Sequence, residues 1–89
     1  MPRLPKREWP EWWHWELELT PHLLKRMNDR RFTELDLRGM LDRARGCSPN
    51  PVPGRWVIAT RRGRRAWEII VEPDASAEVL VVITAYMAE

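Results

Sequence analysis

Residues 55–87 read RWVIATRRGRRAWEIIVEPDASAEVLVVITAYM, in which three apolar runs are separated by two polar turns. Runs rich in β-branched and aromatic residues between turn residues predict strands. The three strands cover residues 55–61, 65–72 and 79–87. Gly63 lies in the first turn, where a positive φ is needed, and residues 73–77 form the second turn. The last run is apolar on both faces, so we expect it to be central in the sheet.

Two helices are predicted upstream of these strands. Thr20-Pro21 places an N-cap residue before a proline at the first helical position, and the helix runs to Asn28 or Arg31. Thr33-Glu34-Leu35-Asp36 is close to a capping box and begins a second helix that ends near Arg43. A turn of only a few residues joins the two helices, which predicts a helical hairpin.

The remaining segments complete the predicted fold. Within residues 12–19, Trp and Leu alternate with His and Glu, and this period of two predicts a half-buried strand. Residues 46–54 contain three prolines and two glycines and predict a loop, whereas residues 1–11 read as a flexible tail. We therefore predict one α+β domain over residues 12–89, in the order β-α-α-β-β-β. The helical hairpin packs on one face of a mostly antiparallel four-stranded sheet, and the other face stays open for a ligand.

The composition is that of a globular chain, with 44% hydrophobic and 31% charged residues among 89. Cys47 is the only cysteine, so no internal disulfide is expected. His14, His22 and Cys47 follow no recognised zinc spacing, so we expect neither a metal nor another cofactor. The longest apolar run, residues 79–88, is about half a membrane span. With no apolar export segment near the N-terminus, the sequence predicts a cytoplasmic protein without membrane association.

Arginine dominates the basic residues, supplying 13 of the 15. Five arginines lie between residues 55 and 65, where the chain has no acid. They are Arg55, Arg61, Arg62, Arg64 and Arg65. The planar guanidinium group suits bidentate contact with phosphate, so this segment is a candidate contact for an RNA backbone. The alternative is an exposed turn that its charge keeps soluble.

Three short motifs follow one another along the chain. They are His-x-x-x-Arg-Met at residues 22–27, Gly-Arg-Trp-Val at residues 54–57 and Val-Ile-Thr-Ala-Tyr at residues 82–86. In this order, over residues 12–87, they resemble a bacterial family of small domains grouped with the RelE-like toxins, in the barnase–EndoU–colicin–RelE ribonuclease superfamily. The resemblance implies a RelE-like fold and a toxin-type, metal-independent endoribonuclease that needs no cofactor, or an inactive descendant of one. The Trp-rich N-terminal segment is not part of the family pattern.

Cleavage of this kind needs a base for the 2′-hydroxyl, an acid for the leaving 5′-oxygen and cations for the charged phosphorane. His22 is the leading candidate acid or base, because imidazole titrates near neutrality. Arg26 lies one helical turn later on the same helix face and could contact the same phosphate. Alternatively, His22 closes the helix start against the sheet, and Arg26 pairs with Asp29 on a solvated surface.

Thr84 and Tyr86 are two residues apart on the last strand and therefore share a face. If that face is the open one, Tyr86 stacks on a base or donates a proton, and Thr84 binds phosphate. Simple alternation also places Leu80 and Val82 on that face, in which case Tyr86 belongs to the edge of the core. Glu68 is a candidate base by analogy with other members of the superfamily.

Four tryptophans, at positions 9, 12, 13 and 15, are surrounded by glutamates, which disfavours contact with phosphate. They predict either a buried strand or an arm that binds a protein partner such as an antitoxin. The sequence therefore leaves two functions open. One is a RelE-like endoribonuclease acting on RNA, and the other is a non-catalytic module that binds RNA or a protein on the same scaffold.

Overall fold

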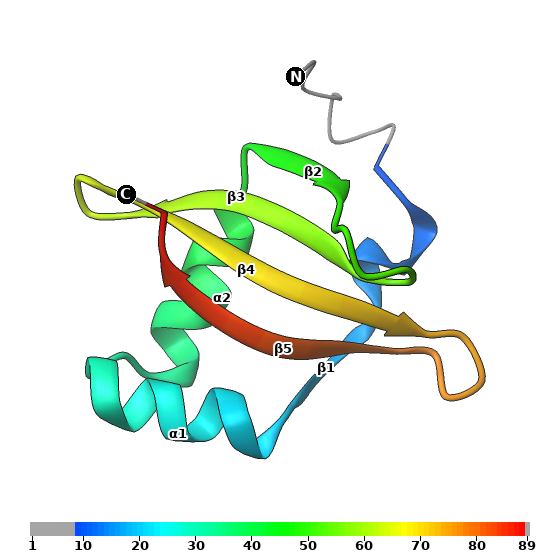
Figure 1. The fold of residues 1–89 in the computed structure, drawn as a ribbon, viewed down its shortest axis with the longest axis horizontal. Coiled ribbons are helices and arrows are strands. Elements are labelled where there is room, and N and C mark those ends of the chain that lie inside the picture. The colour runs from blue at the N-terminus through cyan, green and yellow to red at the C-terminus, as the bar shows by residue number, and fades with distance from the viewer. Residues whose placement is uncertain (1–8, 89) are drawn as a thin grey trace.

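The three predicted C-terminal strands form the middle of the sheet in the structure, a computed structural model that describes residues 9–88 (Figure 1). They are β3 (Trp56–Arg62), β4 (Arg65–Asp74) and β5 (Val79–Met87). Each is antiparallel to the next along the chain. β1 (Glu16–Leu19) runs parallel to β5, and β2 (Gly46–Pro49) runs antiparallel to β3. The sheet order is β1-β5-β4-β3-β2, so β5 lies between two strands, as its apolar sequence predicts.

The sheet has five strands rather than the four that the sequence predicts. The additional strand is β2, which lies in the proline-rich segment predicted to be a loop. β2 is four residues long, at the edge of the sheet, and Pro49 is its last residue. Proline is tolerated at such a position because its missing N–H interrupts no central ladder. The sheet is mixed, since the β1–β5 pairing is parallel and the other pairings are antiparallel.

The N-terminal strand is shorter than the alternation of Trp and Leu predicts. Glu11–His14 form a 3₁₀ helix, η2, and only β1 pairs with β5. The Trp13 N–H donates to the Pro10 carbonyl at 3.0 Å and closes this turn. The tryptophans therefore enter the fold from a helical turn, and the prediction of a strand over residues 12–15 is wrong.

The start of the packed chain lies further towards the N-terminus than residue 12. Trp9 falls within the segment predicted to be a tail, yet its side chain is only 8% exposed and belongs to the core. Residues 1–8 of the predicted tail lie outside the described residues.

α1 (Pro21–Arg30) begins at the predicted cap and is anchored to the sheet there. The Thr20 hydroxyl accepts a hydrogen bond from the Leu23 N–H at 3.1 Å. The same hydroxyl donates to the carbonyls of Val82 and Ile83, 3.1 and 3.0 Å away. One side chain therefore caps the helix and joins it to β5.

α2 (Glu34–Asp42) begins with the capping box that the sequence predicts. The Thr33 N–H donates to the Asp36 carboxylate at 2.8 Å, and the Asp36 N–H donates to Thr33 Oγ1 at 3.1 Å. Both helices lie on one side of the sheet, and the core lies between the two layers (Figure 1). Its fully buried side chains are Leu23, Leu37, Met40, Ile58, Ile69, Val71, Leu80 and Val82. Burying each such side chain stabilises the fold by about 1.5–3 kcal/mol.

A β-bulge in β5 changes which of its residues face the core. Val82 pairs with Val71, but the next pair joins Thr84 to Ile70, so Ile83 is an extra residue. Val71 and Ile70 are consecutive in β4 and face opposite sides of the sheet. Val82 therefore faces the helices, whereas Thr84 faces away from them.

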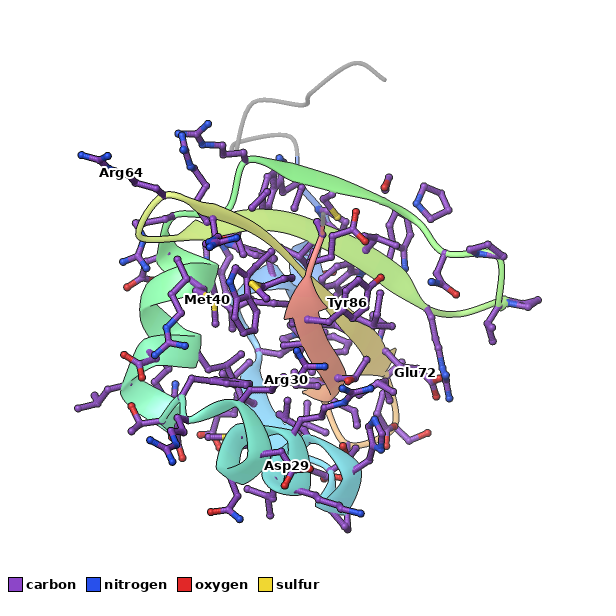
Figure 2. All side chains as sticks on the ribbon, turned by 60° about the vertical axis from the view of Figure 1, so that its left-hand side comes forward. Asp29, Arg30, Met40, Arg64, Glu72 and Tyr86 are labelled. Atoms are coloured by element: carbon purple, nitrogen blue, oxygen red, sulfur yellow. The ribbon has the colours of Figure 1, made fainter. Side chains whose placement is uncertain are left out.

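The bulge brings Tyr86 to the open face. Leu80 and Val82 are buried in the core, so the alternation that places them on the face of Tyr86 is wrong. Figure 2 shows Met40 on the helix side of the strands, with Tyr86 and Glu72 on the other side. No helix among residues 9–88 covers the face that carries Tyr86.

Candidate nucleic-acid interface

Glu68 and Tyr86 form a hydrogen-bonded pair on the open face. They lie directly opposite each other on β4 and β5, and the Tyr86 hydroxyl donates to Glu68 Oε1 at 2.8 Å. Partial burial raises the pKa of Tyr86, and the hydrogen bond to Glu68 and its negative charge raise that pKa further. At neutral pH Tyr86 is therefore a protonated donor that orients the Glu68 carboxylate. The structure brings together these two sequence candidates.

Thr84 lies next to this pair on the same face. Its Oγ1 is buried and has no hydrogen-bond partner among residues 9–88. A buried hydroxyl without a partner costs about 1–3 kcal/mol and is uncommon in native structures. Because the hydroxyl is covered in this conformation, phosphate binding by Thr84 stays a prediction.

Arg61 is a diagonal neighbour of Glu68 on the open face. Glu68 pairs with Ala59, and Arg61 lies two residues further along β3. Diagonal neighbours are about 7–8 Å apart, within reach of long side chains. The Arg61 side chain forms no ion pair with the described residues. An uncompensated cation therefore lies beside the Glu68–Tyr86 pair.

Arg55 differs from Arg61 because it already has a partner. Its Nε lies 3.0 Å from Glu72 Oε1, and both side chains are partly exposed. The acid neutralises this arginine at the end of the sheet distant from the β3–β4 turn.

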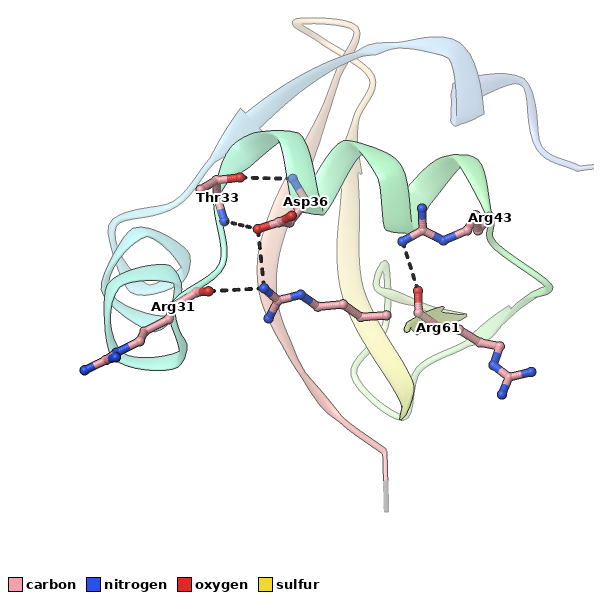
Figure 3. A network of polar contacts seen from close by, with 6 residues as sticks. Arg31, Thr33, Asp36, Arg43 and Arg61 are labelled. Atoms are coloured by element: carbon pink, nitrogen blue, oxygen red, sulfur yellow. Dashed lines mark hydrogen bonds and ion pairs between the residues drawn. The ribbon is translucent and has the colours of Figure 1, made fainter. Parts of the chain in front are cut away.

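Arg62 faces the helices instead of the open face. Its Nη2 donates to the Arg31 carbonyl at 3.2 Å and to Asp36 Oδ2 at 3.4 Å (Figure 3). Its guanidinium carbon lies 5.8 Å from the ring centroids of both Phe32 and Trp67. These contacts join the end of β3 to the turn between the helices, so the structure gives Arg62 a structural role. Binding of RNA by Arg62 stays a prediction.

Two arginines that the sequence did not single out lie beside Arg61. A surface hollow at this end of the sheet is lined by Arg43, Arg45, Arg61 and Gly63. Arg43 follows the last residue of α2, and Arg45 precedes β2. Recognition of β2 as a strand would have placed Arg45 next to the end of β3, but its prolines obscured that signal.

The β3–β4 turn has further arginines on its other side. A second hollow there is lined by Arg30, Arg62, Gly63, Arg65, Trp67 and Met87. Figure 2 shows Arg64 projecting from the turn away from the rest of the molecule. Arginines from α1, the segment after α2 and the β3–β4 hairpin therefore gather at one end of the sheet, which we call the arginine end. Its residues are Arg30, Arg43, Arg45, Arg61, Arg62, Arg64 and Arg65.

Acidic side chains gather at the opposite end of the sheet. Glu16 pairs with Val79 at the start of β5, next to the turn between β4 and β5. The acids of this end are Glu16, Glu18, Glu72, Asp74 and Glu78. The small net charge of +2 therefore conceals a marked separation of charge along the strands.

His22 and Arg26 lie in the helical layer, on α1. His22 is exposed and Arg26 is half-buried, and neither side chain bonds to another described residue. α1 packs against the face of the sheet opposite to Glu68 and Tyr86, and no contact joins His22 to that pair. The catalytic roles of His22 and Arg26 stay predictions.

The tryptophan cluster packs against the core. Trp9 and Trp13 meet edge to face with their ring centroids 4.4 Å apart, and Trp12 lies 5.6 Å from Trp56. Beside them, on the helix side, a shallow groove is lined by Trp13, Trp15, Leu17, Arg38, Leu41, Asp42 and Leu80. Binding of a protein partner at this groove stays a prediction.

Other site chemistries find little support within residues 9–88. Burial raises the pKa of Cys47 to about 11, so its thiol is protonated at neutral pH and is a poor nucleophile. No group of three His, Cys, Asp or Glu side chains in this range could hold a metal ion. Nor does any helix in this range have the length and apolar character required to span a membrane. Comparisons of the chain with protein-family models, with curated proteins and with solved structures found no match.

Proposed function

We propose that this domain is a RelE-like, toxin-type endoribonuclease that cleaves RNA without a metal ion. The observation that carries the proposal is the Glu68–Tyr86 hydrogen bond, 2.8 Å long, on an uncovered sheet face with Arg61 as its diagonal neighbour. An oriented carboxylate, a proton donor and a free cation are the groups that transesterification of RNA requires. The arginine end adjoins this site and supplies sequence-independent attraction for the phosphate backbone.

Each group then has one role in the proposed reaction. Glu68 takes the proton of the 2′-hydroxyl, whose oxygen attacks phosphorus while the bond to the 5′-oxygen breaks. Tyr86 gives its proton to the leaving 5′-oxygen, and the protonated Glu68 returns one to Tyr86 along their hydrogen bond. The products are a 2′,3′-cyclic phosphate and a 5′-hydroxyl, and Arg61 stabilises the charge of the phosphorane. The raised pKa of Tyr86 fits this relay, because the phenolate forms only as Glu68 hands over a proton.

A second candidate function is a non-catalytic module that binds RNA or a protein. It is favoured by the position of His22 and Arg26 in the other layer, which removes two of the expected catalytic groups from the pair. It is also favoured by the arginine end, which would bind RNA whether or not Glu68 is catalytic, and by the tryptophan-lined groove.

The test is cleavage of an end-labelled single-stranded RNA by the purified protein in the presence of a chelator. We expect a product ending in a 2′,3′-cyclic phosphate, and no cleavage of the matching DNA, which lacks the nucleophile. Glu68→Gln should slow cleavage by about 10²–10⁴-fold, the usual contribution of a general base. Glu72→Gln is the control, because it makes the same change on the same strand and face. Since it also releases Arg55 from its ion pair, the cleavage rates are compared at saturating RNA.

Two outcomes would overturn the proposed reaction. One is a wild-type protein that binds the RNA and leaves it intact, which would identify a binding module. The other is a Glu68→Gln variant that cleaves as fast as the wild type, which would place the chemistry elsewhere.

A further inference from the structure

The hollow beside Arg61 combines guanidinium groups from three separate parts of the chain. Arg43 lies at the C-cap of α2, Arg45 in the segment between α2 and β2, and Arg61 near the end of β3. Among the residues that the structure describes, the hollow is lined by Arg43, Arg45, Arg61 and Gly63, and by no acidic side chain. Its volume of about 540 Å³ is in the range of small-molecule sites, so it can admit more than a single ion.

Backbone contacts hold these arginines close together. The Arg43 Nη2 donates to the Arg61 carbonyl at 3.4 Å (Figure 3). The Arg45 N–H donates to the Ala59 carbonyl at 2.7 Å, which fixes the chain beside β3. Gly39 leaves room for the Arg43 side chain, since a Cβ there would meet Arg43 Nη1 at 3.2 Å. The fold therefore places the backbones of these arginines side by side, while the exposed side chains of Arg43 and Arg45 stay free to turn towards a ligand.

No acid within residues 9–88 forms an ion pair with these three arginines. The carboxylate whose pKa responds to Arg43 is Asp36, and Asp36 already bonds to Thr33 and Arg62. The side chains of Arg45 and Arg61 form no hydrogen bond or ion pair with the described residues. Guanidinium groups brought together without a counterion repel one another, and a multivalent anion relieves that repulsion.

We infer that the Arg43–Arg45–Arg61 hollow is a binding site for one phosphoryl group. Arg61 belongs both to this hollow and to the surroundings of Glu68, from which it is offset by two residues, about 7 Å along the strand. The bound group is therefore a phosphate next to the scissile one along the same RNA strand. The assignment of this phosphate to an RNA strand rests on the proposed function, whereas the existence of a phosphoryl site in the hollow does not. The preferred substrate class is RNA that carries at least one phosphate beyond the scissile bond.

The test compares the wild type with the double variant Arg43→Gln/Arg45→Gln, which leaves Arg61 in place. The matched control is Lys25→Gln/Arg31→Gln, which removes the same charge from exposed positions in α1 and directly after it. The first measurement is the affinity for a labelled, non-cleavable single-stranded RNA at several salt concentrations. The second is the shift of the melting temperature caused by inorganic phosphate, against chloride at equal ionic strength. Far-ultraviolet circular dichroism confirms that each variant is folded.

We expect the double variant to bind RNA about tenfold more weakly at 0.1 M salt, the effect of losing one charge-assisted contact. The slope of log affinity against log salt should become shallower by about 0.7, the value for one phosphate on a single strand. The control should keep the slope of the wild type. Stabilisation by inorganic phosphate that the double variant loses would show that the hollow also takes free phosphate. Loss of RNA affinity alone would show that it takes a phosphate only within a strand.

Equal RNA affinity and an equal salt slope in the double variant and the wild type would overturn the inference. This result is separate from the fate of the proposed function, which depends on cleavage at saturating RNA and on Glu68→Gln. A protein that binds RNA through the hollow and never cleaves it would retain the phosphoryl site and lose the reaction.

Discussion

Tyr86 is the only tyrosine in the chain, so its ionisation can be followed by near-ultraviolet absorbance without another phenol interfering. We expect its pKa to lie above the usual value of about 10. Burial is the largest cause, and the hydrogen bond and charge of Glu68 add to it. Glu68→Gln removes the charge and should lower the pKa of Tyr86, although burial will keep it above normal. An unchanged pKa in Glu68→Gln, equal to that of a Glu72→Gln control, would contradict the observed pairing.

The same shift has a consequence for stability at high pH. Because the pKa of Tyr86 is raised in the folded state, the protonated phenol stabilises the fold. This stabilisation is fully present below the pKa of tyrosine in the unfolded chain, about 10. It is lost as the pH rises towards the folded pKa of Tyr86. The free energy of unfolding of the wild type should therefore fall above pH 10 more steeply than that of Tyr86→Phe.

Gly39 is a position where a larger residue should stabilise the protein. It lies inside α2 without a positive φ, and alanine is favoured over glycine in a helix by about 0.5–1 kcal/mol. The new Cβ would meet only the end of the flexible, exposed Arg43 side chain, at 3.2 Å, which can move aside. Gly39→Ala should therefore raise the free energy of unfolding by about 0.5–1 kcal/mol in chemical denaturation.

Gly63→Ala provides a comparison of opposite sign. Gly63 has a φ of 60° in the β3–β4 turn, where a Cβ is strained even though space is available. We expect this variant to be destabilised by about 1 kcal/mol. If Gly39→Ala destabilises the protein instead, the Arg43 guanidinium cannot move away from the new Cβ. The hydrogen bond of Arg43 to the Arg61 carbonyl does not by itself require such rigidity.

At the scale of elements, the parts of the fold with strong local signals were predictable. The N-cap residues Thr20 and Thr33 indicate where the helices begin, and β5 has the predicted bounds. β2 was missed because its prolines are acceptable only at a sheet edge, and edge position is a tertiary property. The tryptophan alternation failed because the segment before Glu16 has no partner strand and turns into η2 instead.

The candidate site shows the same division between local and tertiary information. Arg61 and Arg62 are adjacent and look alike in the sequence, yet one faces the open side and the other binds Asp36 beneath it. Their alternation follows from β3 being a strand, but the side that is open depends on where the helices pack. The position of Tyr86 depends on the bulge at Ile83, and no residue in that run marks a bulge.

The capping box of α2 should make stability depend on pH in the acid range. The hydrogen bond from the Thr33 backbone lowers the pKa of Asp36, and the Thr33 hydroxyl and Arg62 add to this effect. A lowered folded-state pKa means that the stabilisation is present above the unfolded value of about 4 and is lost as the pH falls below it. Asp36→Asn should therefore be less stable than the wild type at pH 6, by thermal denaturation.

The difference between these two proteins should shrink as the pH falls through the lowered pKa of Asp36, because the wild-type carboxylate then becomes protonated as well. Glu34→Gln, which removes a neighbouring acid of the same helix turn outside the capping box, should show a smaller change. A difference between Asp36→Asn and wild type that stays constant from pH 6 to pH 2 would show that the charge of Asp36 does not stabilise α2.

At the scale of the whole molecule, the separation of charge makes a prediction about how far RNA reaches across it. The longest extent of the molecule is 31 Å, with the arginine end and the acidic end at opposite ends of the strands. Electrostatic effects are screened over about 10 Å at 0.1 M salt and over about 30 Å at 0.01 M. RNA held at the arginine end should therefore sense the acids of β1 only at the lower salt concentration.

The variant Glu16→Gln/Glu18→Gln tests whether bound RNA extends from the arginine end to the acids of β1. If RNA occupies the arginine end and the adjoining Glu68–Tyr86 site, this variant should bind as the wild type does at 0.1 M salt. At 0.01 M salt it should bind about two- to threefold more tightly, because the remote repulsion is then unscreened. Equal tightening at both salt concentrations would mean that RNA lies against β1 itself. The strand would then run over the whole open face, and the arginine end would be one contact among several rather than the anchor.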